Sequence, residues 1–298
     1  MNRLFHIFAG AVLAAAVSFG AARADDTRLF ADSTLVTQDR FSDEIVGSGP
    51  DLVFIPGLAS SRATWKATAE RLKAHYRLHL IQIAGFAGEP VRGNAAGEVL
   101  APTAEAIDAY LVAQHLTPAT LVGHSLGGTM LLYLAEHHGD HLKKLLIVDA
   151  LPSAAVLVGG PAATAASVKP IADSVRVSTS PAPNFDQMVA GMVTSPDDRA
   201  LVTGWSRASD PSAVNRAFAD DIELDLKPGL AEIGVPITLL YPDNVPNGAP
   251  AGAMDPFYQG LYAPVPHKTL IRIDNSRHFI MLDQPAQFDA ALDAFLKN

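Results

Sequence analysis

Ser125 stands in a five-residue pattern, Gly123-His124-Ser125-Leu126-Gly127, which matches Gly-x-Ser-x-Gly. A nucleophilic serine in such a pattern sits on a tight, strained turn between a strand and a helix, so the residues two positions away need almost no side chain. The apolar pair Leu121-Val122 leads into the turn, and a helical pattern runs from Leu126 to His138. This context predicts that Ser125 is a nucleophile. The alternative interpretation is an ordinary strand-to-helix turn with a buried serine.

A serine hydroxyl is a poor nucleophile without a neighbouring base. His278 is the histidine placed for that role, because it follows the last predicted strand, Leu270 to Ile273. The other late histidine, His267, precedes that strand and would lie at the opposite edge of the sheet. We therefore expect His278 to act as the base.

The base needs an acid that holds its imidazole in the right tautomer and stabilises its positive form. Asp243 is the first carboxylate after the predicted strand Ile237 to Tyr241, and we favour it. Asp149, which ends the strand before the predicted lid, is one alternative. Asp255 is another, although it also has the position of an N-cap for a helix from Pro256 to Tyr262.

Acyl transfer also needs two main-chain N–H groups that stabilise an oxyanion. We expect one to be the amide of Leu126, the residue after the nucleophile. We expect the other to be the amide of Leu58, in the loop Pro56-Gly57-Leu58-Ala59 after the predicted strand Leu52 to Ile55. Gly57 would let this loop turn toward the nucleophile.

The histidines His137, His138 and His141 cluster at the end of the helix that follows Ser125. Such a group could suggest a metal site, but no carboxylate completes a ligand set at close spacing in the sequence. Histidines near a helix C-terminus are also favoured by the helix dipole. We therefore predict no bound metal at this cluster.

The elements that must position these residues alternate between short apolar runs and helical patterns. This alternation predicts an α/β fold, a mostly parallel sheet with helices on both faces. It breaks between Pro152 and Gly229, where short helical patterns stand without a convincing strand. We therefore predict a core of residues 25–151 and 231–298, with a helical lid of residues 152–230 over the carboxyl edge of the sheet.

The first 24 residues have the pattern of a secretory signal peptide. Arg3 supplies a positive charge, Ile7 to Phe19 form an apolar run too short to span a membrane, and Ala22-Arg23-Ala24 fits a cleavage site. We expect cleavage before Asp25 and a periplasmic or secreted protein. The remaining sequence has no other long apolar run, so we expect no membrane span after cleavage.

Composition excludes several classes of function. The chain has no cysteine, which rules out disulfides, thiolate metal sites and a cysteine nucleophile. Its net charge is −9, and loss of residues 1–24, with their two arginines and no acid, makes it −11. Such a surface repels phosphate backbones, so we expect no nucleic-acid partner.

Three segments resemble the signature segments of the α/β-hydrolase superfamily: Phe54-Ile55-Pro56-Gly57-Leu58, Gly123-His124-Ser125-Leu126-Gly127-Gly128, and Arg277-His278-Phe279-Ile280-Met281-Leu282-Asp283-Gln284-Pro285. The resemblance extends over about residues 40–297 and implies a Ser–Asp–His triad and no cofactor. Two segments depart from the family pattern. Pro56-Gly57 replaces a frequent His-Gly, and Tyr241-Pro242-Asp243 replaces Gly-x-x-Asp, which bears on the choice of acid.

Together these residues predict a serine hydrolase that cleaves a small-molecule carboxylic ester through an acyl-enzyme on Ser125. An amidase, a lactonase or a perhydrolase would use the same residues. A ligand-binding protein with little turnover on the same fold is the alternative from another class.

Overall fold

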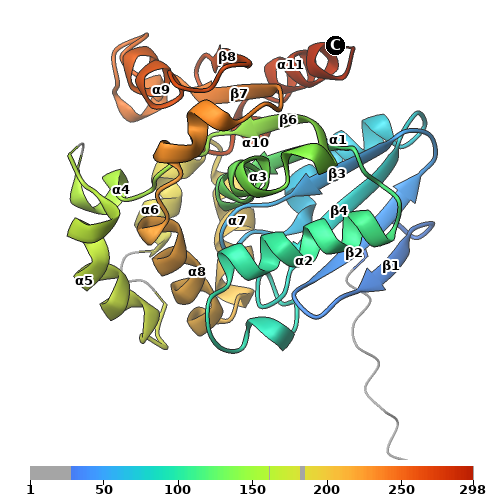
Figure 1. Cartoon of the computed structure of the whole chain (residues 1–298), viewed down its shortest axis with the longest axis horizontal. Coiled ribbons are helices and arrows are strands. Elements are labelled where there is room, and N and C mark those ends of the chain that lie inside the picture. Colours follow the sequence, from blue (N-terminus) through green and yellow to red (C-terminus); the bar gives the residue numbers. More distant parts are fainter. Residues whose placement is uncertain (1–27, 161, 182–184, 298) are drawn as a thin grey trace, which may run out of the picture.

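The computed structural model describes residues 28–160, 162–181 and 185–297, and these contain an eight-stranded sheet with helices on both faces (Figure 1). The strand order is β1-β2-β4-β3-β5-β6-β7-β8. The pairs β1·β2 and β2·β4 are antiparallel and all other pairs are parallel. The predicted α/β fold is therefore confirmed. The predicted signal peptide, residues 1–24, lies outside the described residues.

The strands and the core helices have these bounds: β1 Thr34–Thr37, β2 Phe41–Gly47, β3 Asp51–Ile55, β4 Arg77–Ile83, β5 Ala119–His124, β6 Leu142–Val148, β7 Ile237–Pro242, β8 Lys268–Ile273, α1 Lys66–Leu72, α2 Leu100–Ala113, α3 Leu126–His137, α9 Asp255–Leu261, α10 Ile280–Asp283 and α11 Pro285–Lys297. Successive side chains of a strand point to opposite faces of the sheet. In β3, Val53 and Ile55 pack in the cluster that contains α2, α3 and α9, whereas Leu52 and Phe54 pack in the cluster that contains α1, α10 and α11. Both faces are apolar, which explains why the central strands read as continuous apolar runs.

Strands β1 and β2 were not predicted, because β2 contains acidic residues that look like surface positions. Asp43 and Glu44 are fully buried. Asp43 accepts hydrogen bonds from Tyr110 Oη at 2.9 Å and lies 2.7 Å from His79 Nδ1. Glu44 lies 3.7 Å from the buried guanidinium of Arg62. Buried charges are tolerated when they are paired in this way, but the partners come from distant parts of the sequence.

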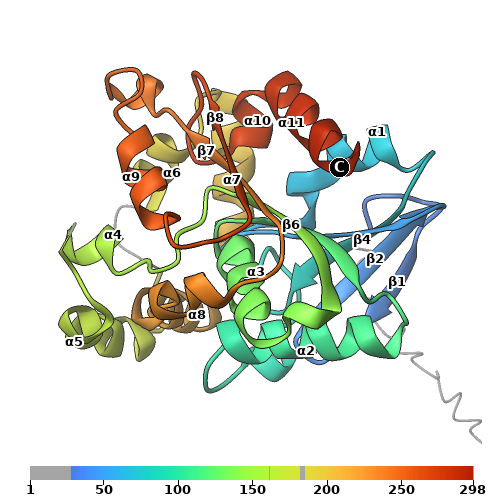
Figure 2. The ribbon, with the colours of Figure 1, turned by 45° about the horizontal axis from the view of Figure 1, so that its top comes forward.

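Between β6 and β7 the described residues contain no strand. The α-helices of this segment, called the cap helices below, are α4 Val156–Gly159, α5 Ala165–Arg176, α6 Phe185–Met192, α7 Pro196–Ala208 and α8 Pro211–Glu223. Figures 1 and 2 show them grouped on one side of the sheet, away from β1. Because the chain enters the cap from the carboxyl end of β6, the cap helices lie at the edge of the sheet where ligands bind in open α/β folds. Among the described helices, none is long and apolar enough to cross a membrane.

Candidate active site

Ser125 forms the turn between β5, which ends at His124, and α3, which begins at Leu126. Its backbone has φ 52° and ψ −123°, a conformation that costs energy for a residue with a side chain. The turn is fixed by main-chain hydrogen bonds at both sides. The Ser125 N–H donates to the Val148 carbonyl at 2.9 Å, and the Thr129 N–H donates to the Ser125 carbonyl at 2.9 Å. Ser125 therefore has the predicted backbone setting.

The glycines around this turn are required by close backbone contacts. A Cβ atom on Gly123 would lie 2.6 Å from the Gly127 carbonyl oxygen, and one on Gly127 would lie 2.5 Å from the Ile55 carbonyl oxygen. A Cβ atom on Gly57 would lie 2.9 Å from the Ser125 Cβ. These distances are shorter than real side chains tolerate. Small residues thus let β3, its following loop and the serine turn meet.

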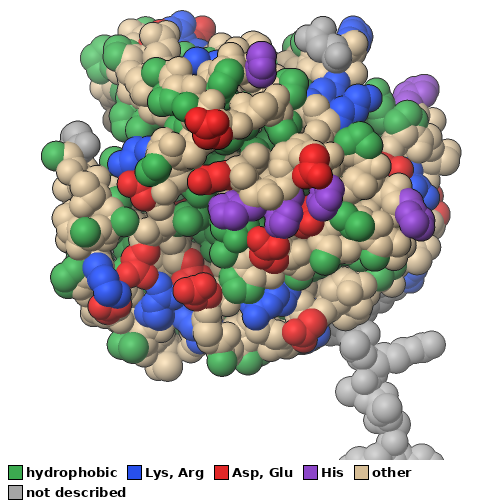
Figure 3. Space-filling view, in the orientation of Figure 1, with side chains coloured by type: hydrophobic (Ala, Val, Ile, Leu, Met, Phe, Trp, Pro, Cys, Tyr) green, Lys and Arg blue, Asp and Glu red, His purple; other side chains and the backbone are tan. Residues whose placement is uncertain are grey.

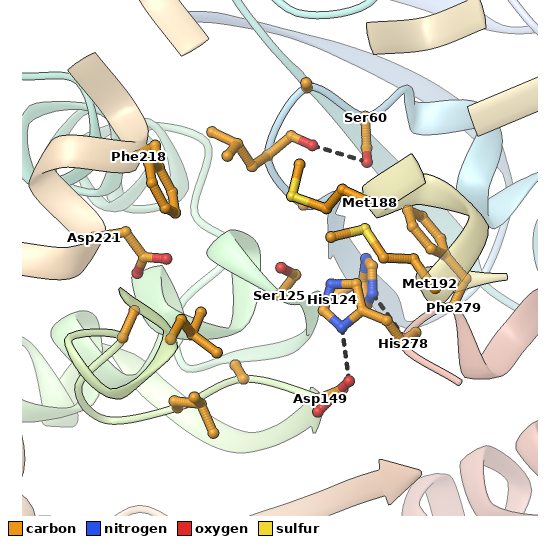
Figure 4. Close-up of a pocket in the computed structure, with 18 of the residues that line it drawn as sticks. Ser60, His124, Ser125, Asp149, Met188, Met192, Phe218, Asp221, His278 and Phe279 are labelled. Atoms are coloured by element: carbon orange, nitrogen blue, oxygen red, sulfur yellow. Dashed lines mark hydrogen bonds and ion pairs between the residues drawn. The ribbon is translucent and has the colours of Figure 1, made fainter. Parts of the chain in front are cut away.

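His278 Nδ1 lies 2.6 Å from Asp149 Oδ2. Since the carboxylate accepts, the Nδ1–H of His278 donates and the neutral ring keeps Nε2 as its acceptor. Both side chains are largely shielded from solvent, with exposed fractions of 23% for His278 and 10% for Asp149. In Figure 4 the His278 ring lies beside Ser125, with Asp149 on its other side. His278 thus lies between Ser125 and Asp149.

Asp149 is held in place by further contacts. It follows β6 directly and has a positive φ of 47°. Its N–H donates to the Leu240 carbonyl at 2.8 Å. The Tyr258 hydroxyl donates to Asp149 Oδ1, and burial raises the pKa of Tyr258 well above its usual value. Tyr258 therefore stays protonated and remains a donor to the carboxylate.

The structure places Asp243 elsewhere, which corrects our choice of acid. The Asp243 carboxylate is buried and accepts hydrogen bonds at 2.9 to 3.3 Å from three main-chain N–H groups, those of Val245, Asn275 and Ser276. It therefore fastens the loop that leads to His278 and does not contact the imidazole.

The alternative Asp149 contacts His278 because of the sheet register. Strands β6 and β7 are parallel neighbours, with Val148 opposite Leu240, so both aspartates reach the same edge. Asp255 also has another role than the predicted N-cap. It is the first residue of α9, and its carboxylate pairs with Arg272 at 2.9 Å.

His124, which precedes the serine, lies against His278 but does not compete with it as a base. Its ring centroid is 4.5 Å from that of His278, and its Nε2–H donates to the His278 carbonyl at 3.1 Å. Burial, followed by the nearby His278, holds the pKa of His124 well below its usual value. His124 is therefore a neutral ring that supports the main chain of His278. Nothing in the sequence pattern distinguishes it from any middle residue of the motif.

The two amides predicted to bind an oxyanion lie around Ser125. Leu126 is the first residue of α3, and N–H groups in the first turn of a helix have no partner within the helix. Leu58 lies in the loop after β3 and lines the same cavity as Ser125. The close approach of Gly57 to Ser125 brings this loop next to the nucleophile. Both amides are therefore near the nucleophile, and their catalytic role stays a prediction.

Ser125 and His278 open into a cavity of about 950 Å³. Its floor comes from the loops at the carboxyl edge of the sheet, and its walls come largely from the cap helices. A cavity of this size can enclose a drug-sized ligand. Most of the lining is apolar, for example Leu151, Val156, Met188, Met192, Val202, Val214, Phe218 and Phe257. Besides Asp149, a second carboxyl group lines it, that of Asp221 on α8, which the sequence did not indicate.

The histidine cluster at the end of α3 has acidic partners that the sequence argument did not find. His141 Nδ1 lies 2.9 Å from Asp108, and His138 Nε2 lies 2.9 Å from Glu105. Figure 3 shows histidine side chains beside acidic ones on this face. Potential ligand atoms of Asp108, His138 and His141 lie within 4.8 Å of one another. The carboxylates come from α2, 33 residues before their histidines, so spacing along the chain could not reveal them, and the absence of a bound metal stays a prediction.

Comparison with known proteins supports the same fold and class. Residues 52–291 match the model of the "Alpha/beta hydrolase family". A pimeloyl-[acyl-carrier protein] methyl ester esterase of Vibrio vulnificus is 36% identical over 106 residues, which is 36% of this chain and 39% of that protein. The chain thus matches only about two fifths of the length of this relative.

Two further comparisons extend over most of the chain. An N-formylmaleamate deformylase of Pseudomonas putida is 27% identical over 255 residues, 85% of this chain and 90% of that protein. The crystal structure of a hydrolase from Pseudomonas aeruginosa has a TM-score of 0.71 at 19% identity, over 90% of this chain and 99% of that one. With the family model matching most of its length, this chain belongs to the alpha/beta hydrolase family.

Proposed function

We propose that the protein hydrolyses carboxylic esters through an acyl-enzyme on Ser125, with His278 as general base and Asp149 as the acid that orients it. The observation that carries this proposal is the 2.6 Å contact between His278 Nδ1 and Asp149. A proton on Nδ1 leaves Nε2 free to accept a proton from the serine hydroxyl.

In the first half-reaction, Ser125 Oγ bonds to the acyl carbon while His278 Nε2 takes its proton. The carbonyl oxygen becomes an oxyanion, which the amides of Leu126 and Leu58 stabilise. Collapse of this intermediate breaks the bond to the alcohol oxygen, which leaves with the proton from His278. Water then attacks the acyl-enzyme, His278 takes its proton, and the acid is released as Ser125 recovers its hydrogen.

Two observations favour an ester with an apolar part. The cavity is lined mainly by aliphatic, methionine and phenylalanine side chains, which suit an acyl or alcohol chain. One relative is named a methyl ester esterase. Amide hydrolysis is the second candidate, because the deformylase resembles this chain over 85% of its length. The same three residues would carry out both reactions.

A panel of p-nitrophenyl esters of increasing acyl length, run beside the matching p-nitroanilides, tests the proposal. We expect ester turnover that rises with acyl length until the cavity is filled, and loss of that turnover in Ser125→Ala. Turnover of anilides with no ester activity would replace the ester proposal with the amide one. Absence of any turnover, or full activity in Ser125→Ala, would overturn both.

A further inference from the structure

A partly buried carboxyl group that lines the cavity, that of Asp221, has no part in the proposed mechanism. Asp221 comes from the cap helix α8, and in Figure 4 it lies on the side of Ser125 opposite to His278. Its carboxylate accepts a hydrogen bond from the side chain of Thr129 on α3. The oxygen Oδ1 has no hydrogen-bond partner among the described residues.

Such a carboxyl group is costly where it stands. Burial raises the pKa of Asp221 to about 7, and the neighbouring Asp220 adds to this while His278 opposes it. A buried oxygen without a partner destabilises a fold, and an apolar residue of similar size would avoid that cost. Groups of this kind are typical of sites where a ligand completes the hydrogen bonds.

The surroundings of Asp221 restrict what that ligand group can be. The nearby wall is apolar, with Phe218 beside the carboxyl group in Figure 4. A neutral hydroxyl or amide N–H loses far less hydration energy on entering such a wall than a cation does. The χ2 torsion of aspartate is broad, so a small rotation can turn a carboxyl oxygen toward the cavity.

We propose that Asp221 is a specificity residue, which binds a hydroxyl or amide N–H carried on an otherwise apolar part of the ester substrate. This inference rests on the proposed function, because it takes the cavity of Ser125 as the substrate site. Asp221 does not touch the reacting atoms in this scheme. It selects among esters by whether they bring a donor to the cap side of the cavity.

Matched p-nitrophenyl esters of ω-hydroxy and ω-methoxy alkanoic acids test this assignment. The hydroxyl can donate a hydrogen bond and the methoxy oxygen can only accept one. At about pH 8 Asp221 is mostly ionised and accepts only, given its pKa of about 7. At the best chain length we expect kcat/KM to be roughly 10- to 100-fold higher for the hydroxy ester in the wild type. Asp221→Leu should abolish that ratio and raise activity on the methoxy ester.

The control is Asp220→Asn, which changes the preceding residue. Its carboxylate accepts the Val99 N–H at 2.6 Å and pairs with Arg176, so it serves the fold rather than the cavity. This variant should keep the wild-type ratio. Asp221→Asn, which retains an acceptor oxygen without the charge, should lower the ratio only in part and serves if Asp221→Leu does not fold.

Equal ratios in wild type and Asp221→Leu, or an equal loss on both esters, would overturn the inference and leave ester hydrolysis standing. Calorimetric binding of the two matched free acids to Ser125→Ala separates the two proposals further. If the wild type turns over no ester but Ser125→Ala binds the hydroxy acid more tightly than the methoxy acid, the proposed function fails and the donor site remains.

Discussion

His278 Nδ1 and Asp149 Oδ2 lie 2.6 Å apart although they are separated by 129 residues in the chain. Asp149 follows the strand next to the serine turn, and His278 follows the last strand of the sheet. Tyr258 donates to the second oxygen of Asp149, so the carboxylate has a donor at each oxygen. A carboxylate acceptor at Nδ1 favours the tautomer that carries its proton there, which leaves Nε2 as the acceptor that the proposed mechanism needs.

The substitution Asp149→Asn should lower kcat for ester hydrolysis by about 10⁴-fold. An amide at this position can donate to Nδ1 and so favour the tautomer in which Nε2 carries the proton and cannot accept one. The measurement is kcat at saturating p-nitrophenyl ester, with circular dichroism to verify folding. A well-folded variant with kcat within tenfold of the wild type would show that Asp149 is not the acid.

The substitution Asp243→Asn should instead act mainly on stability. Its carboxylate accepts main-chain N–H groups from two loops, and an amide cannot accept at both of its atoms. We expect the free energy of unfolding to fall by about 1–3 kcal/mol, with a smaller loss of kcat than for Asp149→Asn. Urea unfolding and kcat on the same ester measure both. A larger loss of kcat in this variant, at unchanged stability, would restore Asp243 as the acid.

The contrast between these aspartates marks the limit of prediction from the sequence. The fold and the nucleophile could be predicted from the apolar runs of β3, β5 and β6 and from the glycines around Ser125. These features depend only on the spacing of residues that are close in the sequence. Asp149 and Asp243 both follow strands that end at the same edge. The two aspartates differ only in the direction of their side chains. The side chain of Asp243 is held by loop amides more than thirty residues away in the sequence.

Buried polar residues could not be predicted for the same reason. Asp43 and Glu44 in β2 look like surface residues until the distant His79 and Arg62 are placed beside them. Asp221 lies in a helix of mixed composition, and nothing in its neighbours along the chain indicates that it faces the cavity. In each case the partner comes from another element of the fold.

The substitution Gly127→Ala should impair both folding and activity. The new Cβ would lie 2.5 Å and 2.7 Å from the carbonyl oxygens of Ile55 and Pro56, which are backbone atoms that cannot rotate away. The loop that carries the Leu58 amide would have to move. We expect kcat/KM to fall by about 10²-fold, as for other displaced catalytic geometry.

Gly204→Ala is the matched control, since Gly204 lies in the cap helix α7 and its Cβ would meet no atom within 4 Å. Alanine is the better helix former, so we expect stability to rise by about 0.5–1 kcal/mol with kcat/KM retained. Equal activity in the two variants would mean that the close approach at Gly127 has no role in catalysis.

The stability of the protein should depend on pH through Asp221. Burial raises its pKa from 3.8 to about 7 in the folded state, so the unfolded chain loses this proton at lower pH than the folded one. The folded state therefore binds more protons between these values, and stability falls as pH rises from about 4 to 7. Asp221→Asn has no carboxyl group to titrate and so loses this pH dependence. Above pH 7 the free energy of unfolding of the variant should exceed that of the wild type by a few kcal/mol.

Urea unfolding of the wild type and of Asp221→Asn across that pH range measures the difference between their free energies of unfolding. The difference near pH 4 is the baseline. His79, whose pKa is also raised, loses its stabilising effect as pH rises through its folded pKa. It is present in both proteins, so its effect cancels in the difference. A gap between the two proteins that does not change with pH would contradict the assigned burial of Asp221.

The measurement that tests the mechanism most directly is labelling by a fluorophosphonate, followed by peptide mass spectrometry. This reagent forms a covalent bond with a serine oxygen only when a neighbouring base activates it. We expect one adduct on the peptide that contains Ser125, formed much more slowly in His278→Ala and in Asp149→Asn and absent in Ser125→Ala. An unlabelled Ser125 in the folded wild type, or labelling that is unchanged in His278→Ala, would contradict the proposed mechanism.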